Sequence, residues 1–176
     1  RFDITPVEEV PFRNENPSAA SNEGIFFVAF EKFTNPLTNQ YTDRDIYGSI
    51  VTMNGQSTVF DICTASGIQA DPQVVYDSLS DQFLVLWEDG RAGTTNYNIY
   101  ARFFSDAGVP VSDEMVLTSR PQTQCEPWVA FDMNHHHFYV VWEEGVSPEE
   151  GPFEIWGQLF DANLNSIRSA QRLSEI

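Results

Sequence analysis

The stretch 71-DPQVVYDSLSDQFLVLWE-88 decides the fold, because the chain of 176 residues contains it three times in altered form. The other two copies are 16-NPSAASNEGIFFVAFE-31 and 126-EPWVAFDMNHHHFYVVWE-143. A proline holds the same place in each copy, and the three prolines are equally spaced along the chain. A polar stretch and two further strand-like segments follow each copy, so the chain consists of three repeats.

Each repeat contains four segments with the pattern of β-strands, which we name a to d in chain order. Strand b is a nearly continuous apolar run such as 83-FLVLW-87, which is typical of a strand covered on both faces. Strand c alternates, and its central residue is always small (Gly48, Ala101, Gly157), which predicts that a neighbouring sheet approaches closely there. Turn sequences such as 54-NG-55 separate the strands.

A repeat of roughly 50 residues with four strands is typical of a β-propeller blade. We therefore predict an all-β protein of three four-stranded antiparallel blade-like units that form one structural domain. The predicted divisions are a leading strand and linker at 1–15 and units at 16–66, 67–120 and 121–176.

The consensus of the units is P-x-V-A-[YF]-D, then F-L-V-[VL]-W-E-D, then N-I-Y-A-R-x-F, then G-x-P. It resembles the propeller-type repeats of secreted and cell-surface proteins of bacteria and archaea, best in 71–119 and 126–162. The first unit departs from it, since Ser18–Ser21 replaces an apolar strand a and Phe30 replaces a tryptophan. The resemblance implies an extracellular or cell-surface location and says little about activity.

Three blades are too few to close a ring, because closed propellers use about four to eight. An open array also exposes its core at both ends. Three arrangements remain open: two chains that close a six-bladed homodimer, a fragment of a longer propeller, or an open stack of blades. The segment 2-FDIT-5 resembles strand 60-FDICT-64, which favours a fragment or a strand exchanged between chains.

The composition excludes some partners. The net charge is −17, from 26 acidic and 9 basic residues, which argues against binding to nucleic acid. The apolar runs are too short for insertion into a membrane as helices. Cys63 and Cys125 are the only cysteines, so a four-cysteine zinc site is excluded, while a disulfide and two buried thiols both stay open.

Long, variable links between strands b and c, at 31–45, 88–98 and 143–154, are the predicted binding face, because such loops on a rigid scaffold usually carry function. Aromatic and charged side chains there can contact a glycan or a protein. The candidate binding residues are Phe33, Tyr41, Asp43, Arg91, Tyr97, Glu149 and Phe153.

Acidic residues recur at the ends of these loops and could bind calcium, which prefers carboxylate and carbonyl oxygens. The calcium candidates are Glu31, Asp45, Glu88, Glu143 and Glu154. A framework role is favoured over calcium, because a residue that repeats in every unit usually serves the unit. In that role the glutamates accept backbone N–H groups or pair with Arg44 and Arg91. No other cofactor is expected.

Two further sites are weighed. The tripeptide 70-ADP-72 resembles a motif near which five-bladed glycoside hydrolases place a catalytic aspartate, so Asp71 with Glu88 or Glu143 is a possible catalytic pair. The repeat itself also explains Asp71, because the residue aligns with Asn16 and Glu126. His135 and His137 could bind a transition metal from one side of a strand, although a solvated turn is favoured.

The sequence thus favours a non-catalytic extracellular binding or scaffold module that uses the b–c loops. A glycosidase-like enzyme with paired carboxylates and a purely structural repeat are the alternatives.

Overall fold

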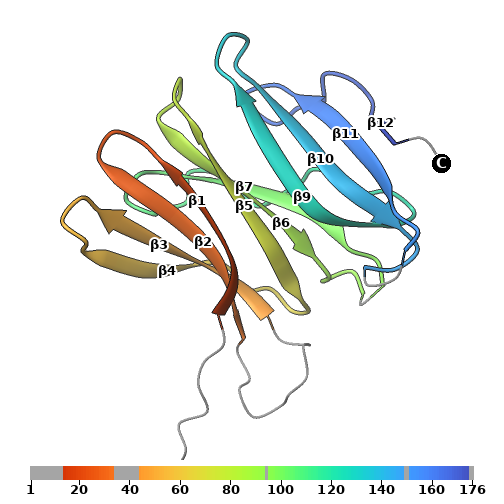
Figure 1. Ribbon diagram of the computed structural model, residues 1–176, viewed down its shortest axis with the longest axis horizontal. Coiled ribbons are helices and arrows are strands. Elements are labelled where there is room, and N and C mark those ends of the chain that lie inside the picture. Colours follow the sequence, from red (N-terminus) through yellow and green to blue (C-terminus); the bar gives the residue numbers. More distant parts are fainter. Residues whose placement is uncertain (1–13, 34–43, 94, 149–150, 175–176) are drawn as a thin grey trace, which may run out of the picture.

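The computed structural model describes residues 14–33, 44–93, 95–148 and 151–174, and every regular element among them is a β-strand. Three four-stranded antiparallel sheets lie side by side (Figure 1). The first contains β1 (Asn14–Ser21), β2 (Ile25–Phe33), β3 (Arg44–Thr52) and β4 (Ser57–Cys63). The second contains β5 (Gln69–Asp77), β6 (Gln82–Asp89), β7 (Asn98–Phe104) and β8 (Met115–Val116). The third contains β9 (Thr123–Asp132), β10 (His137–Gly145), β11 (Glu154–Phe160) and β12 (Gln171–Arg172).

The strand order in each sheet follows the chain, so each sheet is a blade that meanders from strand a to strand d. The all-β prediction of three four-stranded blades is confirmed. The strands a are long, with 8 to 10 residues, whereas the last two strands d have two residues each. The serine-containing segment of the first unit still forms β1, because its ladder to β2 supplies the backbone hydrogen bonds. The first strands β1, β5 and β9 form the inner edge of the array, where β5 contacts both β1 and β9.

Two hydrophobic cores lie between the blades, and β6 supplies both. Phe83, Val85 and Trp87 face the first blade, whereas Leu84 and Leu86 face the third. All five side chains are fully buried, which explains why strand b has no polar alternation. Burying each of these side chains contributes about 1.5–3 kcal/mol relative to exposure.

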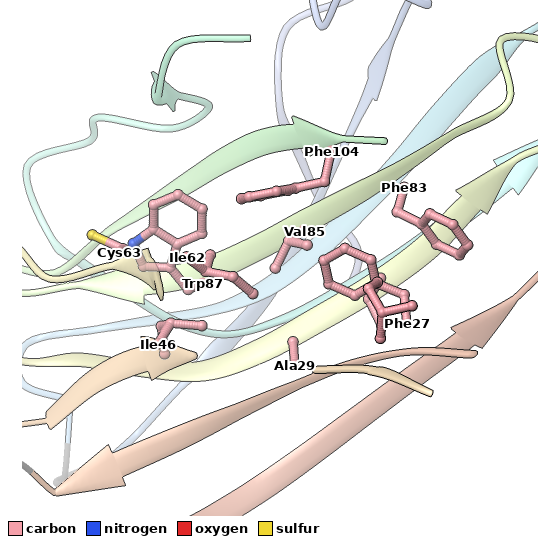
Figure 2. Close-up of a cluster of buried hydrophobic side chains, with 11 residues drawn as sticks. Phe27, Ala29, Ile46, Ile62, Cys63, Phe83, Val85, Trp87 and Phe104 are labelled. Carbon is pink, nitrogen blue, oxygen red and sulfur yellow. The ribbon is translucent and has the colours of Figure 1, made fainter. Parts of the chain in front are cut away.

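Aromatic rings fill the first core. Phe27 of β2 stacks on Phe83 with ring centroids 5.1 Å apart, and it also packs against Phe104. Figure 2 shows these rings together with Trp87 and Ile46 in the layer between the two blades. Offset ring pairs of this kind add about 0.5–1.5 kcal/mol each beyond their buried area.

Two small residues of strand c, Gly48 and Gly157, lie against side chains of their own sheet and not against a neighbouring sheet. A Cβ on Gly48 would lie 2.5 Å from the ring of Phe60, and a Cβ on Gly157 would lie 2.5 Å from the hydroxyl of Tyr139. Phe60 and Tyr139 belong to neighbouring strands of the same blades. The small residues therefore make room for side chains of their own sheet, and the prediction of a close approach by another sheet is wrong at these two positions.

Among the described residues, no helix has the length and apolar content needed to span a membrane.

Candidate functional site at the inner strands

Each inner strand carries a β-bulge at the same place. The ladder register shifts at Asn16 in β1, at Asp71 in β5 and at Glu126 in β9, and each of these residues is followed by a proline. Their φ angles are 48°, 49° and 51°, a left-handed conformation that residues other than glycine adopt infrequently. Bulges of this kind redirect a side chain or an amide out of the ladder and are common beside active sites.

Glu31 occupies the first junction between blades and is completely buried. Its Oε1 accepts hydrogen bonds from the backbone N–H of Asp71 (2.8 Å) and from Nδ2 of Asn16 (2.7 Å). Its Oε2 accepts a hydrogen bond from Nη1 of Arg44 over 3.0 Å. Three donors thus surround the carboxylate, and this compensates for the loss of its hydration.

The second junction repeats the backbone hydrogen bond of the first, with different side chains around it. Glu88, which is 4% exposed, accepts a hydrogen bond from the backbone N–H of Glu126 over 3.2 Å. Asp71 now holds the bulge position that Asn16 holds in the first blade. An amide donates hydrogen bonds, whereas an ionised carboxylate only accepts them. Two facing carboxyl groups therefore favour retention of a proton at this junction.

The pKa directions agree with a retained proton. Burial raises the pKa of Asp71 to about 7, and the charges of Glu126 and Glu31 act in the same direction. Burial, followed by the charge of Asp71, raises the pKa of Glu88 well above its usual range. The two carboxyls are coupled, so the proton belongs to the pair rather than to one residue.

Glu126 completes the group. Partial burial and the charge of Glu143 raise its pKa, and its side chain is exposed to solvent. We call Asn16, Glu31, Asp71, Glu88 and Glu126 the inner carboxyl cluster. Protonated and ionised carboxyls side by side are the arrangement that general acid–base catalysis requires.

The structure brings together Asp71 and Glu88, the first of the two carboxyl pairs proposed from sequence. Glu143 is half-buried on β10, where its charge acts on Glu126. Glu126 is not among the site residues predicted from the sequence, in which Asn16 marks only a repeat position. The signal that identifies both is the residue before each repeated proline.

Two other calcium candidates, Glu154 and Asp45, lie on strands c rather than on the inner strands. Glu154 accepts hydrogen bonds from Nη1 of Arg172 (2.9 Å) and from Nε1 of Trp156 (3.1 Å). Asp45 lies in β3 opposite Lys32 in the ladder. Within the described ranges, no group of three or more histidine, cysteine or acidic side chains is arranged to hold a metal ion.

His135 and His136 lie in the turn between β9 and β10, and His137 is the first residue of β10. The rings of His135 and His137 stack with centroids 5.8 Å apart, and Nδ1 of His135 lies 2.6 Å from Oδ2 of Asp132. His136, which was not proposed, reaches the second blade, with its Nε2 2.8 Å from Oδ2 of the buried Asp77. His136 therefore connects two neighbouring blades on the side opposite the b–c loops.

Arg91 is a loop candidate whose guanidinium is already engaged by the framework. It bonds to the buried Asp89 through Nε and Nη2, pairs with Glu114 and lies 4.3 Å from the ring centroid of Tyr100. The third blade repeats the arrangement, because Arg120 pairs with the buried Glu144 and lies 3.8 Å from the ring centroid of Trp156. These contacts support a structural role for Arg91.

The aromatic loop candidates pack inside their own blades. Phe33 and Tyr97 are buried, and Tyr97 is only 4% exposed. A Cβ on Gly90 would lie 2.6 Å from the ring of Tyr97, and a Cβ on Gly145 would lie 2.7 Å from the ring of Phe153. Their placement supports loop packing rather than ligand stacking. Tyr41, Asp43 and Glu149 lie outside the described residues.

Both cysteines are buried free thiols, Cys63 in β4 and Cys125 in β9. Burial raises the pKa of the Cys63 thiol to about 12 and also raises that of Cys125.

The blades, their meander and their shared inner edge can be compared with known structures. No protein-family model and no curated protein sequence matches the chain. Solved structures do match, and those structures are β-propellers. The fold is that of a β-propeller.

Three of the similar structures come from different organisms. An α-L-arabinanase of Penicillium chrysogenum in complex with arabinobiose gives a TM-score of 0.67 at 14% identity over 92% of this chain and 49% of its own. An α-L-arabinofuranosidase of Lactobacillus brevis gives 0.62 at 14% identity over 91% and 54%. An endo-arabinase of Bacteroides thetaiotaomicron gives 0.57 at 12% identity over 90% and 61%.

The chain spans about half to three fifths of the length of these similar structures. Identities this low establish the fold and leave the activity open.

Proposed function

We propose that this chain contributes the carboxyl site of a glycan-cleaving β-propeller. The observation that carries the proposal is Asp71, whose pKa of about 7 keeps a carboxylic acid available near neutral pH beside other carboxyls. Glycoside hydrolysis requires such a pair, one group as acid and the other as base or nucleophile. The proposal gains support from the three similar structures, whose names describe arabinan- or arabinofuranoside-cleaving enzymes.

The roles follow from exposure and protonation. Asp71 is half-buried and acts as the proton donor to the glycosidic oxygen. Glu126 is exposed and acts from the neighbouring strand as the base or the nucleophile. Glu88 is too buried to touch a substrate and serves to position the bulge of β9 and to share the proton of Asp71. This assignment replaces the pairing of Asp71 with Glu143.

The non-catalytic binding module receives less support. Phe33 and Tyr97 are buried and Arg91 is engaged by carboxylates, so these three loop candidates have little free surface for a ligand. A glycan substrate would be met outside the cell, so the proposal retains an extracellular or cell-surface location.

The test is hydrolysis by the purified chain. Reducing ends released from arabinan, from arabino-oligosaccharides and from a panel of other plant and algal glycans are measured between pH 4 and 9. We expect Asp71→Asn and Glu126→Gln each to lower kcat/KM at least about 100-fold, the usual contribution of a positioned acid or base. Asp113→Asn, which changes an exposed aspartate elsewhere, is the matched control and should retain full activity.

Turnover that survives in Asp71→Asn would remove this residue from the proposal. Absence of turnover on every glycan, together with binding in calorimetry, would instead support the binding module.

A further inference from the structure

The two junctions between blades follow one rule. Each blade has an upstream face, which in blade 2 carries Phe83, Val85 and Trp87 and packs on blade 1. Each blade also has a downstream face, which in blade 2 carries Leu84, Leu86 and Ile99 and packs on blade 3. Every junction therefore joins the downstream face of one blade to the upstream face of the next.

Among the residues that the structure describes, no strand packs on the upstream face of blade 1 or on the downstream face of blade 3. The upstream face of blade 1 carries Phe26, Val28 and Phe30, the counterparts of Phe83, Val85 and Trp87. A groove of about 330 Å³ lies on it, lined by Asn14, Glu15, Pro17, Val28 and Phe30. In blade 2 the equivalent surface around Val85 and Trp87 is covered by Ala29 and Ile46 of blade 1.

The downstream face of blade 3 offers the side chains that fit this groove. Val141 and Ile155 hold the ladder positions of Ala29 and Ile46, and Ile155 is 37% exposed. Trp128 holds the position of Ser18 and is 62% exposed, which is unusual for the largest apolar side chain. Exposed tryptophans of this kind are typical centres of protein interfaces.

The hydrogen bond that joins neighbouring blades has an acceptor without a donor in blade 3 and a donor without an acceptor in blade 1, among the described residues. Glu31 and Glu88 each accept the bulge amide of the next blade. Glu143 is their counterpart in blade 3, opposite Ile155 in the ladder as Glu31 is opposite Ile46. Among the described residues, no donor reaches the Glu143 carboxylate. No side chain among them accepts the backbone N–H of Asn16, whose side-chain amide donates to Glu31 and Asp71.

We propose that the downstream face of blade 3 docks on the upstream face of blade 1 of a second copy of this chain, with Glu143 accepting a hydrogen bond from the backbone N–H of Asn16 of that copy. The two internal junctions provide the template for this contact, because they join the same two kinds of face through the same hydrogen bond. One chain carries both partners of the contact, so identical copies associate head to tail without any other protein. A head-to-tail contact closes into a ring or extends into a chain of copies.

This docking is independent of the proposed enzymatic function, although it would add a second copy's bulge residue beside Glu143 and Glu126.

The first test is the mass in solution, measured by size-exclusion chromatography with light scattering from about 1 to 100 µM. We expect a dimer or a larger head-to-tail assembly. Trp128→Asp and Ile155→Asp should each reduce the mass to that of a monomer.

Met133→Asp is the matched control, because Met133 is an equally exposed apolar residue of blade 3 in the β9–β10 turn. It should leave the assembly intact. A wild-type chain that stays monomeric at 100 µM, or an assembly that survives both face substitutions, overturns the proposal. A monomeric wild-type chain would favour the alternative that further blades of a longer chain cover the two faces.

A cross-link tests the orientation. In the first junction the backbone N–H of Val74 donates to Oγ of Ser18 over 3.1 Å. The corresponding residues of the proposed contact are Ala19 of one copy and Trp128 of the other. A mixture of Ala19→Cys and Trp128→Cys chains should form a covalent dimer with a short bismaleimide linker, whereas each variant alone should not. Cross-linking within either single variant, or none in the mixture, contradicts the head-to-tail orientation.

Discussion

The backbone amide of Asp71 donates a 2.8 Å hydrogen bond to the buried carboxylate of Glu31, which belongs to the preceding blade. The first junction therefore depends on a charged group that is stable only while its three donors stay in place. Removing one member of a buried ion pair lowers the free energy of unfolding by more than the intact pair contributes to it. The reason is that the remaining charge stays desolvated without a partner.

We expect Glu31→Ala to lower the free energy of unfolding by about 3–5 kcal/mol, because it leaves the half-buried Arg44 and the backbone N–H of Asp71 without their acceptor. Urea unfolding followed by tryptophan fluorescence measures the loss. Glu154→Ala is the control, because the partly exposed pair of Glu154 with Arg172 should contribute no more than about 1 kcal/mol. Equal losses in the two variants would contradict a special role for Glu31.

Replacement of Asp71 by asparagine should change how stability depends on pH. The pKa of Asp71 is raised in the folded protein, so its proton stabilises the fold fully at acid pH, and this contribution is lost as the pH rises through about 7. The side-chain amide introduced by Asp71→Asn would donate to Glu88 at every pH, as Asn16 does to Glu31. We therefore expect the variant to gain stability relative to the wild type between pH 4 and pH 8.

The expected gain at pH 8 is about 1–3 kcal/mol, since a pKa change of one corresponds to about 1.4 kcal/mol and solvent screens part of it. Urea unfolding of both proteins at four or five pH values measures it. A stability difference that stays constant, or that favours the wild type more at high pH, would show that no proton is held at this junction.

Gly90→Ala should destabilise the second blade, because the added Cβ would lie 2.6 Å from the ring of Tyr97. Overpacking of this kind costs about 1–3 kcal/mol. Gly24→Ala is the control, since its nearest neighbour is an asparagine oxygen at 3.9 Å. Thermal unfolding by circular dichroism compares the two, and a larger loss in Gly24→Ala would contradict the packing argument.

The native thiols should resist alkylation. Burial raises the pKa of Cys63 to about 12, so almost no thiolate is present at pH 8. We expect iodoacetamide to modify neither cysteine within an hour in the native protein and both cysteines in 8 M urea, as measured by intact mass. Rapid native labelling would show that β4 or β9 opens readily.

Much of the fold could be predicted from the sequence, because blade packing requires a strand b with apolar side chains on both faces, as at Phe83 and Leu84. The lengths of the outer strands d do not follow from the pattern. Strand β8 is only Met115–Val116, since few backbone groups at the outer edge find partners there.

The inner carboxyl cluster could be predicted only in part. The sequence predicts Asp71 and Glu88 as a pair but not Glu126, because the role of Glu126 depends on a left-handed bulge that joins neighbouring blades. The aromatic loop residues are predicted to be exposed because polar residues surround them in the sequence, but those that the structure describes pack inside their blades. Tyr97 follows a polar stretch in sequence, yet the ring folds back on Gly90 because that glycine has no side chain.

The bulge residue contributes its backbone amide to the junction, and every amino acid except proline carries that group. Asn16, Asp71 and Glu126 can therefore differ from blade to blade while the hydrogen bond between blades is retained. Duplicated units could diversify at this position during evolution without losing their ability to stack. The same freedom makes the three bulge positions natural targets for engineering new chemistry into the array.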